Sequence, residues 1–272
     1  MATIIIQRLN GTTYDLDALG FRVKNFDPPL TNWSYSYQQL GTYGASMTGA
    51  QASYLVIPLT LDITAHSIAD YRLQLMELRR IFRSDEDFYV IDAMTPYMRW
   101  RCRAEPAAVS QTGNYWRASD VTINLDCADG FAESVSTTQD GIDYDHQLWG
   151  FGQNLPIGYT PKYTYSTADF IFYNAGNLPL MADDRPVTIR FTGSAPSGFT
   201  LTNQTTGQTL KITKAITPSD QVIIQGFIPL INGQQAYGVS NHGYLDFRTG
   251  ENRLHIDGAN NFTLKFDTRF YY

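Results

Sequence analysis

The chain is 272 residues long, enough for two domains of ordinary size, and carries a formal net charge of −6. Charged residues make up 17% of it, below the roughly 25% typical of a soluble domain. Without a basic run, the sequence argues against a nucleic-acid-binding face. No apolar run reaches the length of a transmembrane helix either, because Val222–Ile231 is interrupted by Gln225, Gly226 and Pro229. We therefore expect neither nucleic-acid binding nor membrane insertion.

The composition favours β-structure. The chain contains 18 Tyr and 15 Phe, together with many Thr, Asn, Gln and Ser residues. A surface rich in tyrosine and poor in charge suits protein contact, although an ordinary all-β protein has the same composition. The start of the chain lacks the apolar stretch of a signal peptide, which predicts synthesis in a cytosol. Cys102 and Cys127 fall on separate expected strands, and buried thiols are favoured over a disulfide or a metal pair.

The first part of the chain alternates short strands and turns. Residues 3–8 and 12–16 flank Asn10-Gly11, a dipeptide that favours a tight hairpin turn. A strand over 21–26 ends at Asp27-Pro28-Pro29. Trp33, Tyr35 and Tyr37 then alternate with serines, which predicts a strand with one buried face.

Glycines and one helix follow. Gly41, Gly44 and Gly49 predict a loose, mobile segment, and 54–64 reads as a long strand in which Pro58 indicates an edge position or a bulge. A helix is expected over 67–83, capped by Ser67 with Asp70 three residues on. Its apolar stripe predicts packing onto a sheet, and the stripe comprises Ile68, Tyr71, Leu75, Leu78 and Phe82. Strands at 87–92, 97–103 and 115–127 complete a β-sandwich or open barrel, which we assign to residues 1–132.

The periodicity fails over 133–166, which is rich in Ser, Thr, Gln, Gly and Pro and predicts a connector. Residues 167–272 then show short strands with turn signals every eight to twelve residues and no helix. This pattern predicts a jelly-roll-like or galectin-like β-sandwich. Its expected strands are 169–174, 186–192, 198–202, 208–213, 221–225, 244–247, 252–256 and 262–270.

The residues do not gather into a catalytic set. There is no Gly-x-Ser-x-Gly elbow, and Gly150-Phe151-Gly152 lacks the third glycine of a dinucleotide fingerprint. His255 and Asp257 share a strand face and leave a metal or acid–base pair open, but a solvent-exposed histidine is the simpler interpretation. We therefore expect no catalytic, cofactor-binding or metal-binding residues. Tyr173, Tyr237 and Tyr244 are candidates for contact with a sugar or a partner.

The order of several segments resembles the distal tail proteins of long, non-contractile-tailed bacteriophages. In the N-terminal half these are Tyr14-Asp15-Leu16, Leu19–Val23 running into Phe26-Asp27, the helix 67–83 and Tyr97-x-Arg99-Trp100. In the C-terminal half they are Phe172–Asn177, Asp220–Ile224 before Asn232-Gly233, Leu245-Asp246-Phe247, Gly250-Glu251-Asn252 and the last strand. The likeness covers nearly the whole chain but involves structural residues.

The resemblance implies a ring, usually a hexamer, formed by N-terminal domains at the distal end of the tail tube. One face would meet the tail tube protein, and the other would meet a tail-associated fibre or baseplate hub protein. The C-terminal domain, galectin-like in this family, would project outward and in some members carries receptor-binding parts. The location implied is the tail tip of the virion, after assembly in the cytoplasm of a bacterial host.

A closed ring needs two different patches that meet on neighbouring subunits, and β-hairpins suit such contacts. We expect them in the hairpin 3–16 and in the glycine-rich segment 38–53, which would order on assembly. The candidate interface residues are Ile4, Ile6, Tyr14, Tyr35, Tyr37, Tyr43, Met47 and Tyr54. The alternatives are a lectin-like module that recognises cell-wall saccharide and, third, a polysaccharide-degrading enzyme.

Overall fold

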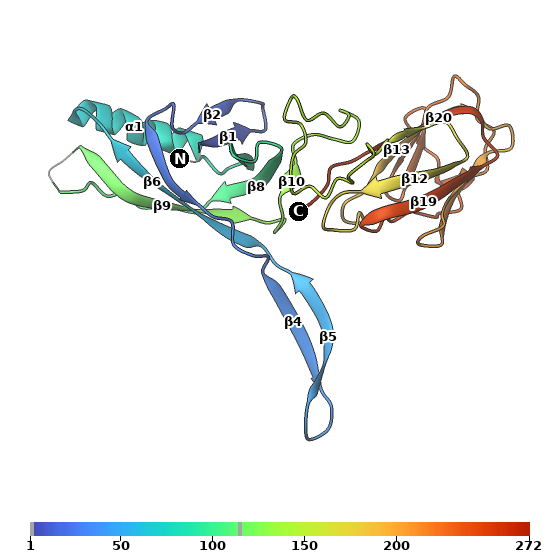
Figure 1. Ribbon diagram of the computed structural model, residues 1–272, viewed down its shortest axis with the longest axis horizontal. Coiled ribbons are helices and arrows are strands. Elements are labelled where there is room, and N and C mark those ends of the chain that lie inside the picture. Colours follow the sequence, from blue (N-terminus) through green and yellow to red (C-terminus); the bar gives the residue numbers. More distant parts are fainter. Residues whose placement is uncertain (1–2, 114–115) are drawn as a thin grey trace. The chain divides into compact units, whose positions relative to one another are not determined.

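The computed structural model describes residues 3–113 and 116–272. The chain divides into two compact units, Met1–Glu133 (unit 1) and Ser134–Tyr272 (unit 2). Both consist mainly of β-strands, as predicted (Figure 1). Residues 134–166, expected as a connector, are counted with unit 2, and their Trp149 and Tyr163 belong to its core.

In the described part of unit 1, strands form an eight-stranded sheet and a separate two-stranded hairpin. The sheet has the order β2-β1-β7-β8-β9-β6-β3, and β10 pairs with β8 beside this path. Two edge strands, β2 and β3, remain, which fits the open-barrel alternative better than a two-sheet sandwich. The elements are β1 (Ile4–Arg8), β2 (Thr13–Asp15), β3 (Phe21–Phe26), β4 (Trp33–Gln39), β5 (Ala45–Ala52), β6 (Leu55–Thr64), α1 (Ile68–Ile81), β7 (Phe88–Asp92), β8 (Met98–Ala104), β9 (Arg117–Cys127) and β10 (Glu133–Ser134).

Helix α1 forms where the capping pattern predicts it. The Ser67 hydroxyl accepts from the Asp70 backbone N–H at 3.1 Å, and the Asp70 carboxylate accepts from the His66 N–H at 2.9 Å. Most of the expected stripe is buried in the core of unit 1, but Ile68, in the first turn, is 44% exposed. The helix therefore packs on the sheet through its later turns. Among the described residues, none of the helices has the length and apolar character required to span a bilayer.

Two strands of unit 1, β4 and β6, differ from their predictions. β4 has no buried face, because all of its residues are exposed. β6 is not an edge strand, because it lies between β9 and β3. Pro58 is tolerated there because it lies one residue beyond the last β3–β6 pair, Phe26↔Leu59, where its missing N–H has no partner strand to serve. Tyr115, the expected start of the strand before Cys127, lies outside the described residues.

A buried arginine joins β1 to the segment after α1. Arg8 is 7% exposed, and its Nη1 donates to the Arg83 carbonyl at 2.6 Å while its Nη2 pairs with Glu86 at 2.8 Å. The guanidinium also lies 5.6 Å from the centre of the Phe88 ring. These contacts satisfy a charge that would otherwise be costly to bury.

In the described part of unit 2, two sheets share one aromatic-rich core and form the predicted β-sandwich. One has the order β11-β20-β13-β16-β17-β18 and the other β12-β19-β14-β15. The elements are β11 (Thr164–Tyr165), β12 (Asp169–Asn174), β13 (Thr188–Ser194), β14 (Phe199–Asn203), β15 (Gln208–Ile212), β16 (Val222–Gln225), β17 (Ile228–Ile231), β18 (Gln234–Gln235), the 3-10 helix η1 (Tyr237–Val239), β19 (Gly250–Asp257) and β20 (Asn260–Asp267).

The strand expected at 244–247 is wrong. Leu245 and Phe247 are buried in alternation, as in a strand, but the backbone pairs only through an isolated bridge between Phe247 and Leu180. The Asp246 side chain instead accepts from the Ala182 N–H at 2.8 Å. Alternating burial thus arises here in a loop fixed by side-chain bonds.

Candidate assembly surface

The β4–β5 hairpin is the most exposed regular structure of unit 1. Every residue of β4 is exposed, and in β5 only Gly49 is partly buried. Figure 1 shows the hairpin extending from the sheet of unit 1, and the bond from the Ser53 N–H to the Asn32 carbonyl at 2.8 Å continues its pairing towards β3 and β6. A two-stranded hairpin without a covered face is marginally stable in water. Its exposure therefore makes it a candidate surface for contact with another molecule.

The register gives this hairpin two different faces. Residues directly opposite each other in an antiparallel pair point to the same side. Trp33 lies opposite Ala52, Tyr35 opposite Ala50, and Tyr37 opposite Met47. The other face carries serine, glutamine and glycine, namely Ser34, Ser36, Gln38, Ser46, Gly49 and Gln51. One face is therefore aromatic and the other polar.

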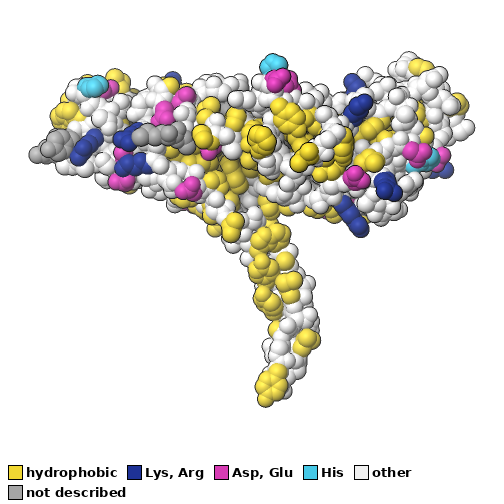
Figure 2. Space-filling model, in the orientation of Figure 1, with side chains coloured by type: hydrophobic (Ala, Val, Ile, Leu, Met, Phe, Trp, Pro, Cys, Tyr) yellow, Lys and Arg dark blue, Asp and Glu magenta, His cyan; other side chains and the backbone are white. Residues whose placement is uncertain are grey.

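No charged side chain occurs in the sequence from Pro28 to Leu61, which contains the whole hairpin. Tyr35 is 52% exposed and Tyr37 64%, with ring centres 6.4 Å apart, and Figure 2 shows the hydrophobic side chains along the hairpin. Uncharged, aromatic surfaces are characteristic of the centre of protein interfaces. The aromatic face of the hairpin, defined by Trp33, Tyr35, Tyr37 and Met47, is therefore the candidate assembly surface.

The other five candidate interface residues, Ile4, Ile6, Tyr14, Tyr43 and Tyr54, differ in how far their side chains are exposed. Tyr43 at the hairpin turn and Tyr54 at its base are exposed, so both are available for contact. Tyr14 is half-buried under the Arg80 guanidinium. Ile4 and Ile6 have to be corrected: both are completely buried in the core of unit 1, because β1 lies between β2 and β7, and neither presents a side chain to another subunit.

The segment 38–53 is also corrected. Its glycines predicted a loose segment that orders on assembly, but most of it forms the turn and second strand of a paired hairpin with one shift in its register. Gly41 and Gly44 adopt positive φ values of 66° and 88° and close the turn, and the Leu40 N–H donates to the Gly44 carbonyl at 3.0 Å. The signal for the strand was the alternation of Ala45 and Met47 with Ser46 and Thr48.

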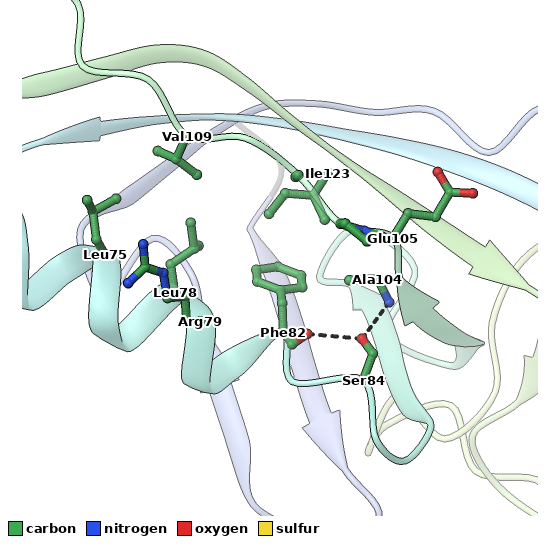
Figure 3. Close-up of a pocket in the computed structure, with 11 residues that line it drawn as sticks. Leu75, Leu78, Arg79, Phe82, Ser84, Ala104, Glu105, Val109 and Ile123 are labelled. Carbon is green, nitrogen blue, oxygen red and sulfur yellow. Dashed lines mark hydrogen bonds between the residues drawn. The ribbon is translucent and has the colours of Figure 1, made fainter.

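A small apolar pocket of about 300 Å³ lies beside α1 (Figure 3). Leu75, Leu78 and Phe82 of the helix side face Val109 and Ile123 across it. Arg79 and Glu105 also line it, and its base is held by Ser84, whose hydroxyl donates to the Phe82 carbonyl at 3.0 Å and accepts from the Ala104 N–H at 2.8 Å. The pocket therefore has an apolar wall on the helix side and two charged residues, Arg79 and Glu105, in its lining.

Three arginines alternate along β8, a pattern that by itself predicts a solvated strand face, and the structure pairs all of them with carboxylates. Arg101 and Arg103 both bind Asp87, at 2.5 Å each. Burial opposes ionisation of Asp87, but the hydrogen bonds from Arg103 and Arg101 outweigh it and lower its pKa. Arg99 is not solvated: its side chain is 11% exposed and pairs with Glu133 at 2.5 Å. The three ion pairs therefore connect β8 to Asp87, just before β7, and to Glu133 of β10.

His255 lies between two carboxylates on unit 2. Its Nδ1 is 2.7 Å from Asp169 and its Nε2 is 3.1 Å from Asp257. The hydrogen bond with Asp169, followed by that with Asp257, raises the pKa of His255. Because both ring nitrogens are engaged, the arrangement serves better as an ion triad between β12 and β19 than as a general base. Within residues 3–113 and 116–272, no three His, Cys, Asp or Glu side chains are grouped for metal binding.

The three tyrosines considered for sugar contact each have a separate neighbour in unit 2. The Tyr173 hydroxyl donates to the Asn154 carbonyl at 3.0 Å. Tyr237 stacks on His242 with ring centres 6.0 Å apart, and Tyr244 meets Phe227 edge-on at 5.0 Å. These contacts favour packing roles.

Residues 9–127, from the first turn to the end of β9, match the family model of the phage tail protein RIFT-related domain. These residues are similar to that family and are called the phage tail domain below. The phage tail domain contains the hairpin, α1 and most of the eight-stranded sheet. No curated protein sequence matches the chain.

The fold beyond the phage tail domain is also shared with solved structures. The Dit protein of phage SPP1, described as a paradigm of the hub adsorption apparatus in phages that infect Gram-positive bacteria, superimposes with a TM-score of 0.71 at 15% identity, covering 99% of both chains. A chain of the phage P2 baseplate in its activated conformation with Ca gives a TM-score of 0.50 at 8% identity, covering 98% of both. The same baseplate with Sr gives 0.51 at 9% identity and 98% coverage. The predicted resemblance to distal tail proteins is therefore confirmed.

Proposed function

We propose that the chain is a structural protein of the distal tail of a long-tailed bacteriophage and acts by protein–protein contact. The phage tail domain and the full-length likeness to the SPP1 Dit fold support a place at the tail tip of the virion. The engagement of both His255 nitrogens supports a role without catalysis. Assembly would take place in the cytoplasm of the bacterial host.

The observation that carries the proposal furthest is the exposed aromatic face of the hairpin within the phage tail domain. In a ring, this face of one subunit would contact a different patch on the next, which is the heterologous contact that closes cyclic assemblies. Such a surface is uncharged, so its burial carries little desolvation cost. The resemblance to distal tail proteins suggests a hexamer of unit 1.

A ring of unit 1 has two further faces, and we assign one to the tail tube protein and the other to a tail-associated fibre or baseplate hub protein. Unit 2 would then be available to a receptor-binding protein. The lectin-like alternative would use Tyr173, Tyr237 and Tyr244 to contact a sugar. Each of these side chains already contacts another residue of unit 2, which favours a packing role for them and the assembly function for the chain.

The oligomeric state of the purified full-length chain tests this function. Light scattering after size-exclusion chromatography is expected to give the mass of a closed oligomer, with ring particles under negative stain. The same measurement with the purified tail tube protein covers the case of a ring that closes on its tube. A chain that stays monomeric in both samples contradicts the proposal, and so does a chain that releases sugar from cell-wall polysaccharide.

A further inference from the structure

The eight-stranded sheet of unit 1 has a narrow joint between β8 and β9. The register of this pair consists of Arg103↔Asp126 and Ala104↔Leu125. On the far side of β9, in contrast, the pairing with β6 runs from Leu55↔Cys127 to Thr64↔Arg117. The β8–β9 ladder is the shorter of the two, and it alone joins the strands β2-β1-β7-β8 to the strands β9-β6-β3 along the sheet order.

The same register brings the two cysteines face to face. Because β8 and β9 are antiparallel, one step beyond Arg103↔Asp126 places Cys102 opposite Cys127. Both side chains enter the core of unit 1 and are 2% and 0% exposed. Two thiols thus meet at the end of the narrow joint, on its buried side.

The alternation of the ladder fixes the spacing of this pair. The Glu105 N–H donates to the Asn124 carbonyl at 2.9 Å, which marks these residues as a hydrogen-bonded pair. Hydrogen-bonded and non-hydrogen-bonded pairs alternate along an antiparallel ladder, so the cysteines form a non-hydrogen-bonded pair with Cα atoms about 4.5 Å apart. That separation lies within the range of roughly 4.4–6.8 Å found in disulfides.

The two thiols also differ in acidity. A hydrogen bond with Cys127, and then burial, raises the pKa of Cys102. The same bond stabilises the Cys127 thiolate, and although burial opposes it, the pKa of Cys127 is lowered. In the closed sheet Cys127 is therefore the more acidic thiol of the pair.

We propose that Cys102 and Cys127 form a cross-strand disulfide when the chain meets a disulfide oxidant, and that this bond pins β8 to β9. With glutathione disulfide, the thiolate of either cysteine, here written for Cys127, attacks one glutathione sulfur, forms a mixed disulfide and releases one glutathione thiolate. Cys102 then loses its proton and attacks the Cys127 sulfur, which releases the second. Two electrons pass to the oxidant, and the two thiol protons pass to the released glutathione.

Burial determines when this exchange happens. Neither thiol is accessible in the closed sheet, so the reaction takes place while the chain folds or while the short β8–β9 ladder is open. In a reducing cytosol the pair stays as two thiols, and the bond forms in an oxidising medium. The inference concerns the covalent state of unit 1 and does not depend on ring formation.

The test uses the full-length chain, unfolded with reductant and refolded in a glutathione buffer that is either mostly oxidised or mostly reduced. Each sample is then denatured in an alkylating reagent, and labelled thiols are counted by intact mass and peptide mapping. We expect no labelled cysteine and a peptide linking Cys102 to Cys127 after oxidising refolding, and two labelled cysteines after reducing refolding. Closing a loop of roughly 25 residues should raise the melting temperature of unit 1 by on the order of 10 °C, reversibly with reductant.

Cys102→Ser and Cys127→Ser are the matched controls, each expected to keep one labelled thiol and to show no redox-dependent melting shift. The comparison of oxidised and reduced wild type does not require these variants to fold. Two labelled thiols after oxidising refolding, or a bond between two chains instead, overturns the proposal. A bond that forms without raising the melting temperature overturns the pinning role. Light scattering on the same samples scores the ring separately, so the two proposals fail independently.

Discussion

Replacing Tyr35 and Tyr37 by serine removes the centre of the aromatic face of the hairpin. About half of each side chain is exposed in the single chain, 52% and 64% respectively. Complete burial of a large apolar side chain contributes about 1.5–3 kcal/mol, so covering the exposed half contributes about 1 kcal/mol for each tyrosine. The double variant should therefore weaken each subunit contact by about 2 kcal/mol, or roughly 30-fold in its dissociation constant.

The stability of the isolated chain should hardly change, because β4 is exposed along its whole length and the two rings are neighbours of each other. Urea unfolding should give the same free energy to within about 0.5 kcal/mol. Light scattering over a dilution series measures assembly, and the double variant should dissociate at a clearly higher concentration than wild type. Ser34→Ala with Ser36→Ala, on the polar face of the same strand, is the matched control. If control and tyrosine variants assemble alike, the aromatic face is not the interface.

Three further changes test the interior. At Gly130 (φ +69°), a Cβ would lie 2.6 Å from the Ser53 carbonyl oxygen, so Gly130→Ala should destabilise unit 1 by about 2 kcal/mol in urea unfolding. Gly11→Ala is the matched control, because Gly11 also has a positive φ (+86°) but faces open space, and it should cost about 1 kcal/mol. Equal losses in the two variants would exclude the close approach at Gly130. Arg8→Met removes a buried arginine that donates to the Arg83 carbonyl and pairs with Glu86, and it should cost more than about 2 kcal/mol in the same assay. A neutral result would show that the arginine is dispensable. Because the pKa of His255 is raised on folding, its stabilisation is complete below the unfolded pKa and is lost as pH rises through the folded pKa. The unfolding free energies of wild type and His255→Gln should therefore converge between about pH 6 and about pH 9, by less than about 1 kcal/mol because the group is exposed. A difference that stays constant with pH would contradict the ion triad.

Local patterns predicted most of the elements because the physics that fixes them is local. Helix α1 depends on the reciprocal bonds of Ser67 and Asp70, whose spacing is visible in the sequence. The first hairpin depends on Asn10-Gly11, where the Asn10 side chain accepts from the Thr12 N–H at 3.0 Å. In such places the residue types determine the backbone, and tertiary contacts only confirm it.

The predictions that were wrong have a common cause. A sequence pattern indicates whether a residue is buried or flexible, but it does not identify the strand that packs beside it. Ile4 and Ile6 alternate as expected for a half-buried strand, yet only the pairing of β1 with both β2 and β7 shows that this face is core. Gly49 weakens a strand in general, but in β5 it pairs with Ser36 on the polar side of the ladder, beside a shift in the register between Ser36 and Tyr37. The arrangement of Cys102 opposite Cys127 likewise required the register of β8 and β9.

The cross-strand partners of the aromatic residues argue that the hairpin is shaped for another molecule. A hairpin that had to stabilise itself would gain from aromatic or β-branched residues opposite Trp33 and Tyr35, because such pairs contribute up to about 1 kcal/mol over alanine. Ala52 and Ala50 stand there instead. Alanine leaves the flanks of both rings open, and an open ring on an uncharged ribbon gains its stabilisation only when a partner covers it. The sequence of this hairpin therefore favours contact between chains over the stability of the single chain.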